Sequence, residues 1–66
     1  MLQMSNYSSE FLSANLPEAM NCADVNDALD MLSDLIDLKG FNEDEEYNDF
    51  GTQAQYVYDD LFANND

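Results

Sequence analysis

The clearest helical pattern of apolar and polar positions lies in the middle of the chain. Its apolar residues recur every three or four positions, which places them on one face of a helix; they are Val25, Ala28, Leu29, Leu32, Leu35 and Ile36. Asn21 suits the N-cap, and Gly40 suits the left-handed position that often follows a helix end. Lys39 falls in the last turn, where the helix dipole favours a cation. The pattern predicts a helix over residues 22–39.

A second periodic stretch covers most of the C-terminal third. Asn42 and Glu45 have the spacing of a capping box, and the apolar stripe that follows comprises Tyr47, Phe50, Ala54, Val57, Tyr58 and Leu61. Gly51 interrupts this pattern and costs a helix about 1 kcal/mol relative to Ala. The sequence therefore predicts either one helix over residues 43–63 or two segments that separate near Gly51.

The N-terminal region has a weaker pattern. Residues 1–8 show no period, which is typical of a loose terminal arm, and a short helix is expected to begin after Ser8 or Ser9. Pro17 either ends that helix or takes the first position of a new turn over residues 17–20. The predicted fold is all-α: a small three-helix bundle with a possible short fourth turn.

Composition supports one domain, residues 1–66, but the high net negative charge opposes a compact fold. Fifteen Asp and Glu face a single Lys and no Arg or His, for a formal net charge of −14. High net charge is typical of disordered chains, whereas an apolar fraction of 45% in helical register favours folding. A compact chain with this charge repels itself, so we interpret the negative field as functional and directed at a basic partner.

The residues that are absent exclude most chemistry. Without His or Arg, no Ser or Cys has a partner that would activate it as a nucleophile, so we expect no enzyme and no cofactor. One Cys and no His provide no zinc site, and the acidic run lacks EF-hand spacing, so no metal site is expected. The N-terminus has no secretory pattern and no stretch is long enough for a membrane span; with the lone thiol, this leads us to expect a cytosolic location.

The central helix is expected to carry an acidic row opposite its apolar stripe. At about 100° per residue, four aspartates share one narrow sector: Asp27, Asp30, Asp34 and Asp37. They span about 15 Å, or one charge per roughly 5 Å, against one phosphate per about 3.4 Å along a DNA strand. An ordinary solvated face is the alternative, but such a face would normally mix Lys with Asp, because like charges at this spacing destabilise a helix.

A second group of candidate contact residues lies in the C-terminal third. These side chains are expected to project away from its apolar stripe or to form the densest acidic run; they are Glu43, Asp44, Glu45, Glu46, Asp49, Tyr56 and Asp60. Tyr56 is a candidate for stacking on arginine. Met31 and Leu38 lie between the apolar and acidic sectors of the central helix, where a core role is expected and partner contact is the alternative.

In size, charge and fold class the chain resembles the small acidic proteins that phages and mobile elements encode against host defence. These include anti-CRISPR proteins, restriction inhibitors and uracil-glycosylase inhibitors. The resemblance covers composition and acidic rows and includes no motif, so no functional residue is carried over. It implies a DNA mimic that blocks the basic groove of a nucleic-acid-binding protein, with a CRISPR effector favoured because its channels are long and basic. An acidic regulatory partner, such as an antitoxin or an inhibitor of a transcription factor, is the alternative. Direct binding of nucleic acid or membrane is not expected, and a homo-oligomer is possible but not indicated.

Overall fold

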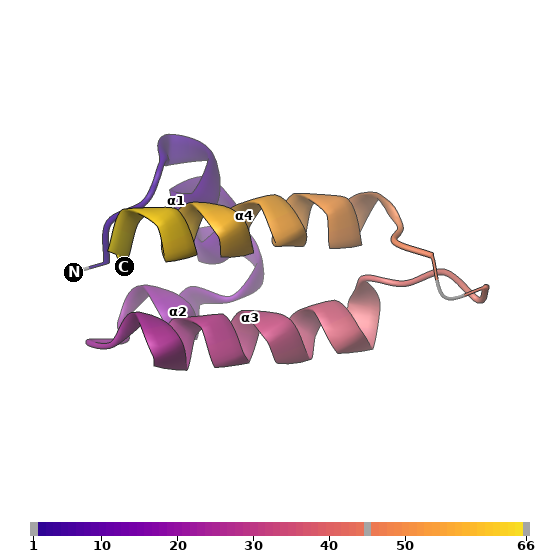
Figure 1. Cartoon of the computed structure of the whole chain (residues 1–66), viewed down its shortest axis with the longest axis horizontal. Helices are drawn as coiled ribbons and strands as arrows, with labels where there is room; N and C mark the ends of the chain where they lie inside the picture. Colours follow the sequence, from indigo (N-terminus) through magenta and orange to yellow (C-terminus); the bar gives the residue numbers. More distant parts are fainter. Residues whose placement is uncertain (1, 45, 66) are drawn as a thin grey trace.

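The computed structural model describes residues 2–44 and 46–65, and the protein is an all-α bundle. Four helices follow one another in the described part of the chain (Figure 1): α1 (Asn6–Asn15), α2 (Pro17–Met20), α3 (Val25–Lys39) and α4 (Asp49–Asn65). Apart from one antiparallel bridge pair, Phe41 with Tyr47, these residues form no β-structure. The predicted fold class is confirmed, with the short turn at residues 17–20 present as α2.

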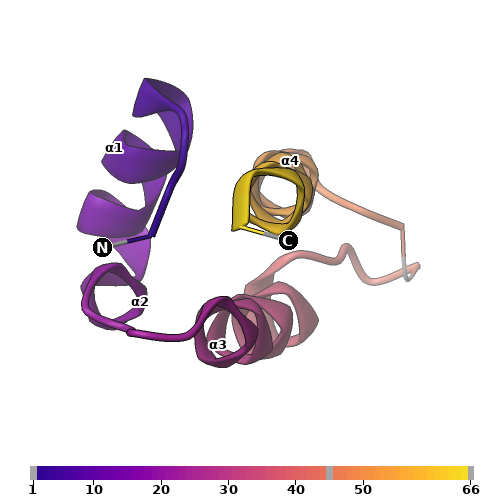
Figure 2. The same cartoon turned by 60° about the vertical axis from the view of Figure 1, so that its left-hand side comes forward.

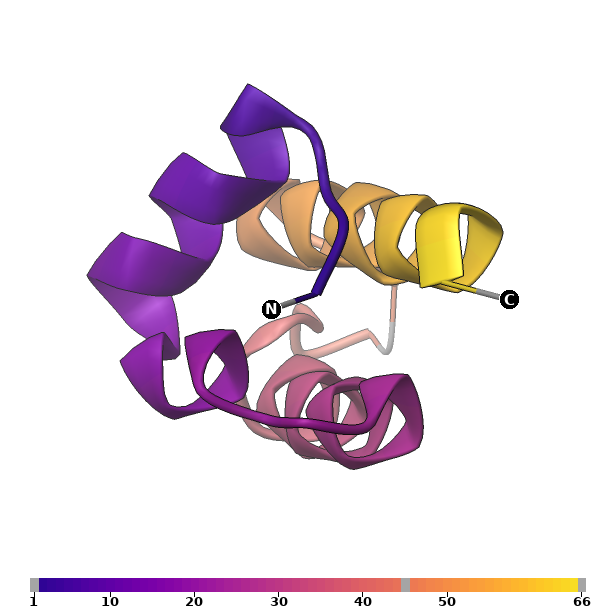
Figure 3. The same ribbon diagram turned by 90° about the vertical axis from the view of Figure 1, so that its left-hand side faces the viewer.

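Helices α3 and α4 form an antiparallel hairpin that is the long axis of the molecule (Figure 1). Helix α1 packs on α4, and α2 joins α1 to α3 across one side of the hairpin (Figures 2 and 3). The buried apolar core draws on all four helices and on the segment before α1: Leu2, Phe11, Leu12, Ala19, Ala28, Leu29, Leu32, Ile36, Ala54, Val57 and Leu61. The predicted stripes of the two long helices therefore meet in one core, except for Tyr47, which lies before α4 and is 49% exposed.

Residues 40–48 connect the hairpin in a turn rather than in a helix. The Asn42 backbone N–H donates to the Glu46 carbonyl at 2.8 Å, and the Asn48 N–H donates to the Gly40 carbonyl at 3.0 Å. The Asn48 side chain then caps α4, because its Oδ1 accepts from the Gly51 N–H at 2.7 Å. The prediction that the last helix begins at position 42 or 43 was wrong, since Asn48 and not Asn42 caps it.

Two glycines bring the ends of this connection together. A Cβ on Gly51 would overlap the Gly40 carbonyl oxygen and lie 2.9 Å from a ring carbon of Tyr47. Gly51 is therefore where α4 touches the end of α3, and α4 continues through it without a break. Gly40 has φ −88° and ψ 0°, so the predicted left-handed conformation was wrong. A Cβ at this position would lie 2.7 Å from the Ile36 carbonyl oxygen and 3.1 Å from the Gly51 Cα.

The segment before α1 is packed against α4 and does not form a loose arm. Leu2 is buried, and Gln3 exchanges two hydrogen bonds with the Asn65 side chain, at 2.8 and 2.6 Å. Helix α1 starts at Asn6, earlier than predicted, because the Ser5 hydroxyl accepts from the Ser8 N–H as an N-cap.

The start of α3 also differs from the prediction. Asp24 is the N-cap, with its side chain accepting from the Asn26 N–H at 2.9 Å, so the helix begins at Val25 and Asn21 instead ends α2. Pro17 occupies the first turn of α2, where its missing N–H leaves no bond unmade. All four aspartates of the predicted row remain within α3.

Candidate functional site

The four aspartates of α3 (Asp27, Asp30, Asp34 and Asp37) are all exposed. We call them the α3 acidic row. They lie on the side of the helix opposite its buried residues, because the buried positions are centred about 180° away around the helix. None of these carboxylates accepts a hydrogen bond from another residue in the described part of the chain. The row is therefore a solvent-facing set of charges, of which only Asp27, in the first turn of α3, has a favourable interaction with the helix dipole.

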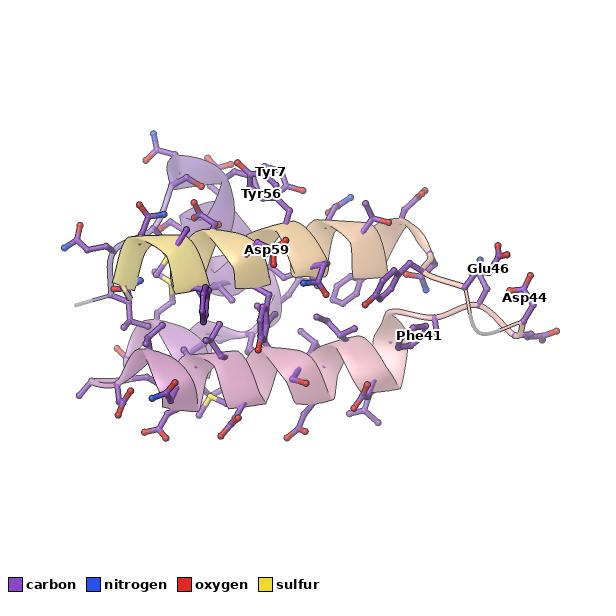
Figure 4. All side chains as sticks on the ribbon, viewed as in Figure 1. Tyr7, Phe41, Asp44, Glu46, Tyr56 and Asp59 are labelled. Carbon is purple, nitrogen blue, oxygen red and sulfur yellow. The ribbon has the colours of Figure 1, made fainter. Side chains whose placement is uncertain are left out.

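The connection between α3 and α4 carries a second acidic group at the end of the molecule farthest from the termini (Figure 4). Glu43, Asp44 and Glu46 are exposed, whereas Glu45 lies outside the described residues. The capping-box spacing had predicted that these residues form the first turn of a helix. They lie instead in the antiparallel turn between α3 and α4. Phe41 and Tyr47 stack across this turn with ring centroids 4.9 Å apart.

Asp49 follows this group as the first residue of α4, and it is exposed. A carboxylate in a first helical turn interacts favourably with the helix dipole. Asp49 therefore has a structural use as well as a place beside the acidic connection.

Asp60 differs from the other predicted contact residues because its carboxylate is used inside the fold. Its Oδ2 accepts from the Ser5 backbone N–H at 2.9 Å and from the Ser8 hydroxyl at 2.7 Å, and its Oδ1 accepts from the Asn64 amide. Ser8 is fully buried. The Ser5 N–H, followed by the Ser8 hydroxyl, holds the pKa of the Asp60 carboxyl below its ordinary value.

Asp60 therefore anchors the start of α1 to α4. The prediction that its side chain projects away from the fold was wrong, because the carboxylate turns toward the start of α1 and accepts from Ser5 and Ser8; its role in partner contact stays a prediction. The buried Ser8 hydroxyl needs an acceptor, and Asp60 provides it.

Tyr56 is exposed to 54% but is not isolated. Its ring meets the Tyr7 ring edge to face, with centroids 5.1 Å apart (Figure 4). With Thr52 and Gln53, the two rings line an open groove of about 420 Å³ between α1 and α4. Tyr56 is thus placed on a different side of the bundle from the α3 acidic row.

The apolar side chains next to the α3 acidic row are more exposed than the sequence predicted. Leu38 is 81% exposed and Met31 is 36% exposed, so the expected core role was wrong for Leu38. Both side chains line a shallow groove of about 320 Å³, together with Leu16, Leu35 and two carboxylates, Glu18 and Asp34. The sequence showed only that Met31 and Leu38 lie between the apolar and acidic sectors of α3. Which of the two side chains is buried depends on how α2 packs against α3.

Few other side chains on this surface could bind a metal ion or react. No three Asp, Glu, Cys or His side chains of the described residues converge as ligands for a metal ion. The Cys22 thiol is half-buried and donates to the Glu18 carbonyl at 3.7 Å. No helix among the described residues combines the length and apolarity that crossing a bilayer requires.

Comparison with known proteins adds no relative: no family model matches the chain, and no curated protein or solved structure is significantly similar to it. The function must therefore be argued from the surface itself.

Proposed function

We propose that the protein is a non-enzymatic inhibitor that mimics nucleic acid and occupies the basic groove of a nucleic-acid-binding protein. Within this class we favour a component of host defence, a CRISPR effector, as the target, and the cytosol of the host cell as the place of action. The observation that carries the proposal is the α3 acidic row. It holds four exposed carboxylates at a regular spacing on one helix, and they take part in no hydrogen bond within the described fold.

The energetic argument separates this row from an ordinary solvated surface. Each like-charged pair at a spacing of three or four residues costs a helix about 0.2–0.5 kcal/mol. A helix that needs only solubility avoids this cost by alternating signs. The row therefore lowers the stability of the free protein, and a partner rich in Lys and Arg offsets that cost when it binds.

The packing of α3 supports mimicry over coupled folding. The row lies on a helix whose opposite side is buried against α4 and α2, so the charges keep their spacing before the partner arrives. An acidic regulator that folds on its target, the alternative function, would be largely unfolded alone. Circular dichroism of the free protein at physiological salt distinguishes the two, since mimicry requires a helical free chain.

The experiment is capture of partners from host lysate on immobilised protein, repeated with competing duplex DNA or guide RNA. The proposal predicts a basic nucleic-acid-binding protein that either competitor displaces and that high salt releases, because phosphate-type contacts weaken steeply with salt. Partners that neither competitor nor salt affects would overturn it.

A charge-reversed variant then locates the contact. Asp30→Lys with Asp34→Lys should abolish capture of the displaceable partner while helicity is kept. The matched control is Glu10→Lys with Asp59→Lys, two exposed acids on α1 and α4, which changes the net charge equally. If the control reduces capture as much as the row variant does, net charge alone is responsible and the row is not the contact surface.

A further inference from the structure

We propose that the groove beside the α3 acidic row is the apolar part of the same binding surface, and that it takes a basic amphipathic segment of the partner protein. The inference rests on the proposed function for the class of partner. It adds that recognition is not purely electrostatic: the partner inserts one or two large apolar side chains beside its Lys and Arg residues.

Leu38 is exposed beside the α3 acidic row. At 81% it is the most exposed of the large apolar side chains in the described part of the chain, and it stands on α3 within about 40° of Asp34. Met31 lies about two turns earlier, on the same edge of the helix. The largely exposed Leu38 and the partly exposed Met31 share one edge of the helix and form a continuous patch with the neighbouring charges.

The shape of the groove also favours this occupant. Leu16 and Leu35 form the remainder of its apolar lining, where the junction of α1 and α2 meets α3. A cavity of about 150 Å³ holds benzene, so an open groove of about 320 Å³ has room for one or two large apolar side chains.

Charge complementarity selects the occupant. The polar side chains that line the groove are Glu18 and Asp34, both acidic, and the row continues on either side of Asp34. Lys39, the one cation of the sequence, does not line the groove. An apolar side chain flanked by Lys or Arg fits this surface, whereas nucleic acid is repelled by it.

A second copy of the chain is a poor occupant on the same grounds. Each copy has a formal net charge of −14, and a symmetric contact through this groove would place the two acidic rows against each other.

The probe is a synthetic helical peptide with Leu at helical spacing and Lys elsewhere, compared with a peptide in which every Leu is Ala and the charge is unchanged. Binding is measured by calorimetry at physiological salt. The wild-type protein should bind the Leu/Lys peptide at least about tenfold more tightly than the Ala/Lys peptide. Backbone amide resonances of Met31 and Leu38 should shift when it binds.

The test variant is Leu38→Gln, and the matched control is Phe62→Gln on α4, where Phe62 is 55% exposed and lies outside the groove. Leu38→Gln should weaken binding of the Leu/Lys peptide about 10- to 100-fold, the range expected for a buried leucine, and remove the preference over the Ala/Lys peptide. Phe62→Gln should leave that preference intact. Leu38→Ala, which favours the helix, gives a second variant with the same direction of effect.

Several results would contradict the proposed binding of a basic amphipathic segment in the groove. One is an undiminished preference for the Leu/Lys peptide in Leu38→Gln; another is an equal loss in Phe62→Gln. A wild-type dimer in sedimentation that Leu38→Gln dissociates would show that a second copy is the occupant. If Leu38→Gln captures the nucleic-acid-displaceable partner as well as wild type, the groove fails while the proposed function stands. If the peptide results hold but reversal of Asp30 and Asp34 leaves capture intact, the proposed function fails instead.

Discussion

Helices α3 and α4 both carry aspartates outside their apolar stripes, yet they use them differently. On α4, Asp60 accepts hydrogen bonds from the Ser5 N–H and the Ser8 hydroxyl and thereby fixes the start of α1. On α3, four aspartates face solvent along one side. The same residue type is a structural acceptor in one helix and an uncompensated surface charge in the other. Only the charges that the fold does not use are free to act on a partner.

The largest effect is expected at the structural aspartate. Asp60→Ala leaves the buried Ser8 hydroxyl and the Ser5 N–H without their acceptor, which should lower the free energy of unfolding by about 2–3 kcal/mol. Asp59→Ala, one position away and exposed, should change it by less than about 0.5 kcal/mol. Urea denaturation followed by circular dichroism measures both; equal effects would remove the distinction between the two kinds of aspartate.

The pH dependence of the same contact provides a second test. Because the folded-state pKa of Asp60 is lowered from its ordinary 3.8, its contribution is fully present above about pH 4 and is lost as the pH falls through the lowered value. The stability difference between wild type and Asp60→Ala should therefore be constant from pH 7 to about pH 5 and shrink below pH 4. A difference that grows on acidification would contradict the assigned hydrogen bonds.

The α3 acidic row keeps its position only if α3 packs firmly on α4, and the two helices meet at the Gly40–Gly51 contact. Gly51→Ala should destabilise the protein by about 1–2 kcal/mol in urea denaturation, since the clash with the Gly40 carbonyl exceeds the gain of about 1 kcal/mol in helix propensity. Ala63→Gly, in the exposed last turn of α4, is a control in which propensity alone acts. A stabilised Gly51→Ala variant would show that the two helices do not touch there.

Salt should produce the smallest effect on the free protein. Raising ionic strength from about 0.01 to 0.15 M shortens the screening length from about 30 to 8 Å, so repulsion along the α3 acidic row weakens and the wild type should gain up to roughly 1 kcal/mol of stability. Thermal melts at the two salt concentrations measure the gain. A melting temperature that falls with salt would mean that attractive ion pairs dominate.

The apolar period along the chain was enough to predict the all-α fold and the end of α3, although it placed the start of α3 three residues too early, because one helix face accounts for the burial of Leu29, Leu32 and Ile36. Local patterns failed where a distant contact decides the outcome. Asn48 caps α4 because its side-chain amide also donates to the Lys39 carbonyl at 2.8 Å, which ties the two helices together. A pattern within one segment does not contain that pairing.

In the candidate site, too, local patterns predicted some features and long-range contacts decided the others. Exposure of the α3 acidic row followed from helical angles, since each aspartate lies opposite the buried stripe. The roles of Asp60 and Leu38 did not, because one depends on α1 crossing α4 and the other on how far the short helix α2 covers α3. Sequence predicts which face of a helix is polar, but neighbouring helices decide which polar side chains are used.

Whether the α3 acidic row serves binding at the expense of stability is tested by measuring stability and capture in one pair of variants. Asp30→Asn with Asp34→Asn removes three like-charged pairs from α3, whereas Glu10→Gln with Asp59→Asn neutralises two exposed acids outside the row. The row variant should gain roughly 1 kcal/mol of unfolding free energy and lose capture of the nucleic-acid-displaceable partner, while the control should change neither. A row variant that captures its partner as well as wild type, or that is less stable, would contradict this role of the row.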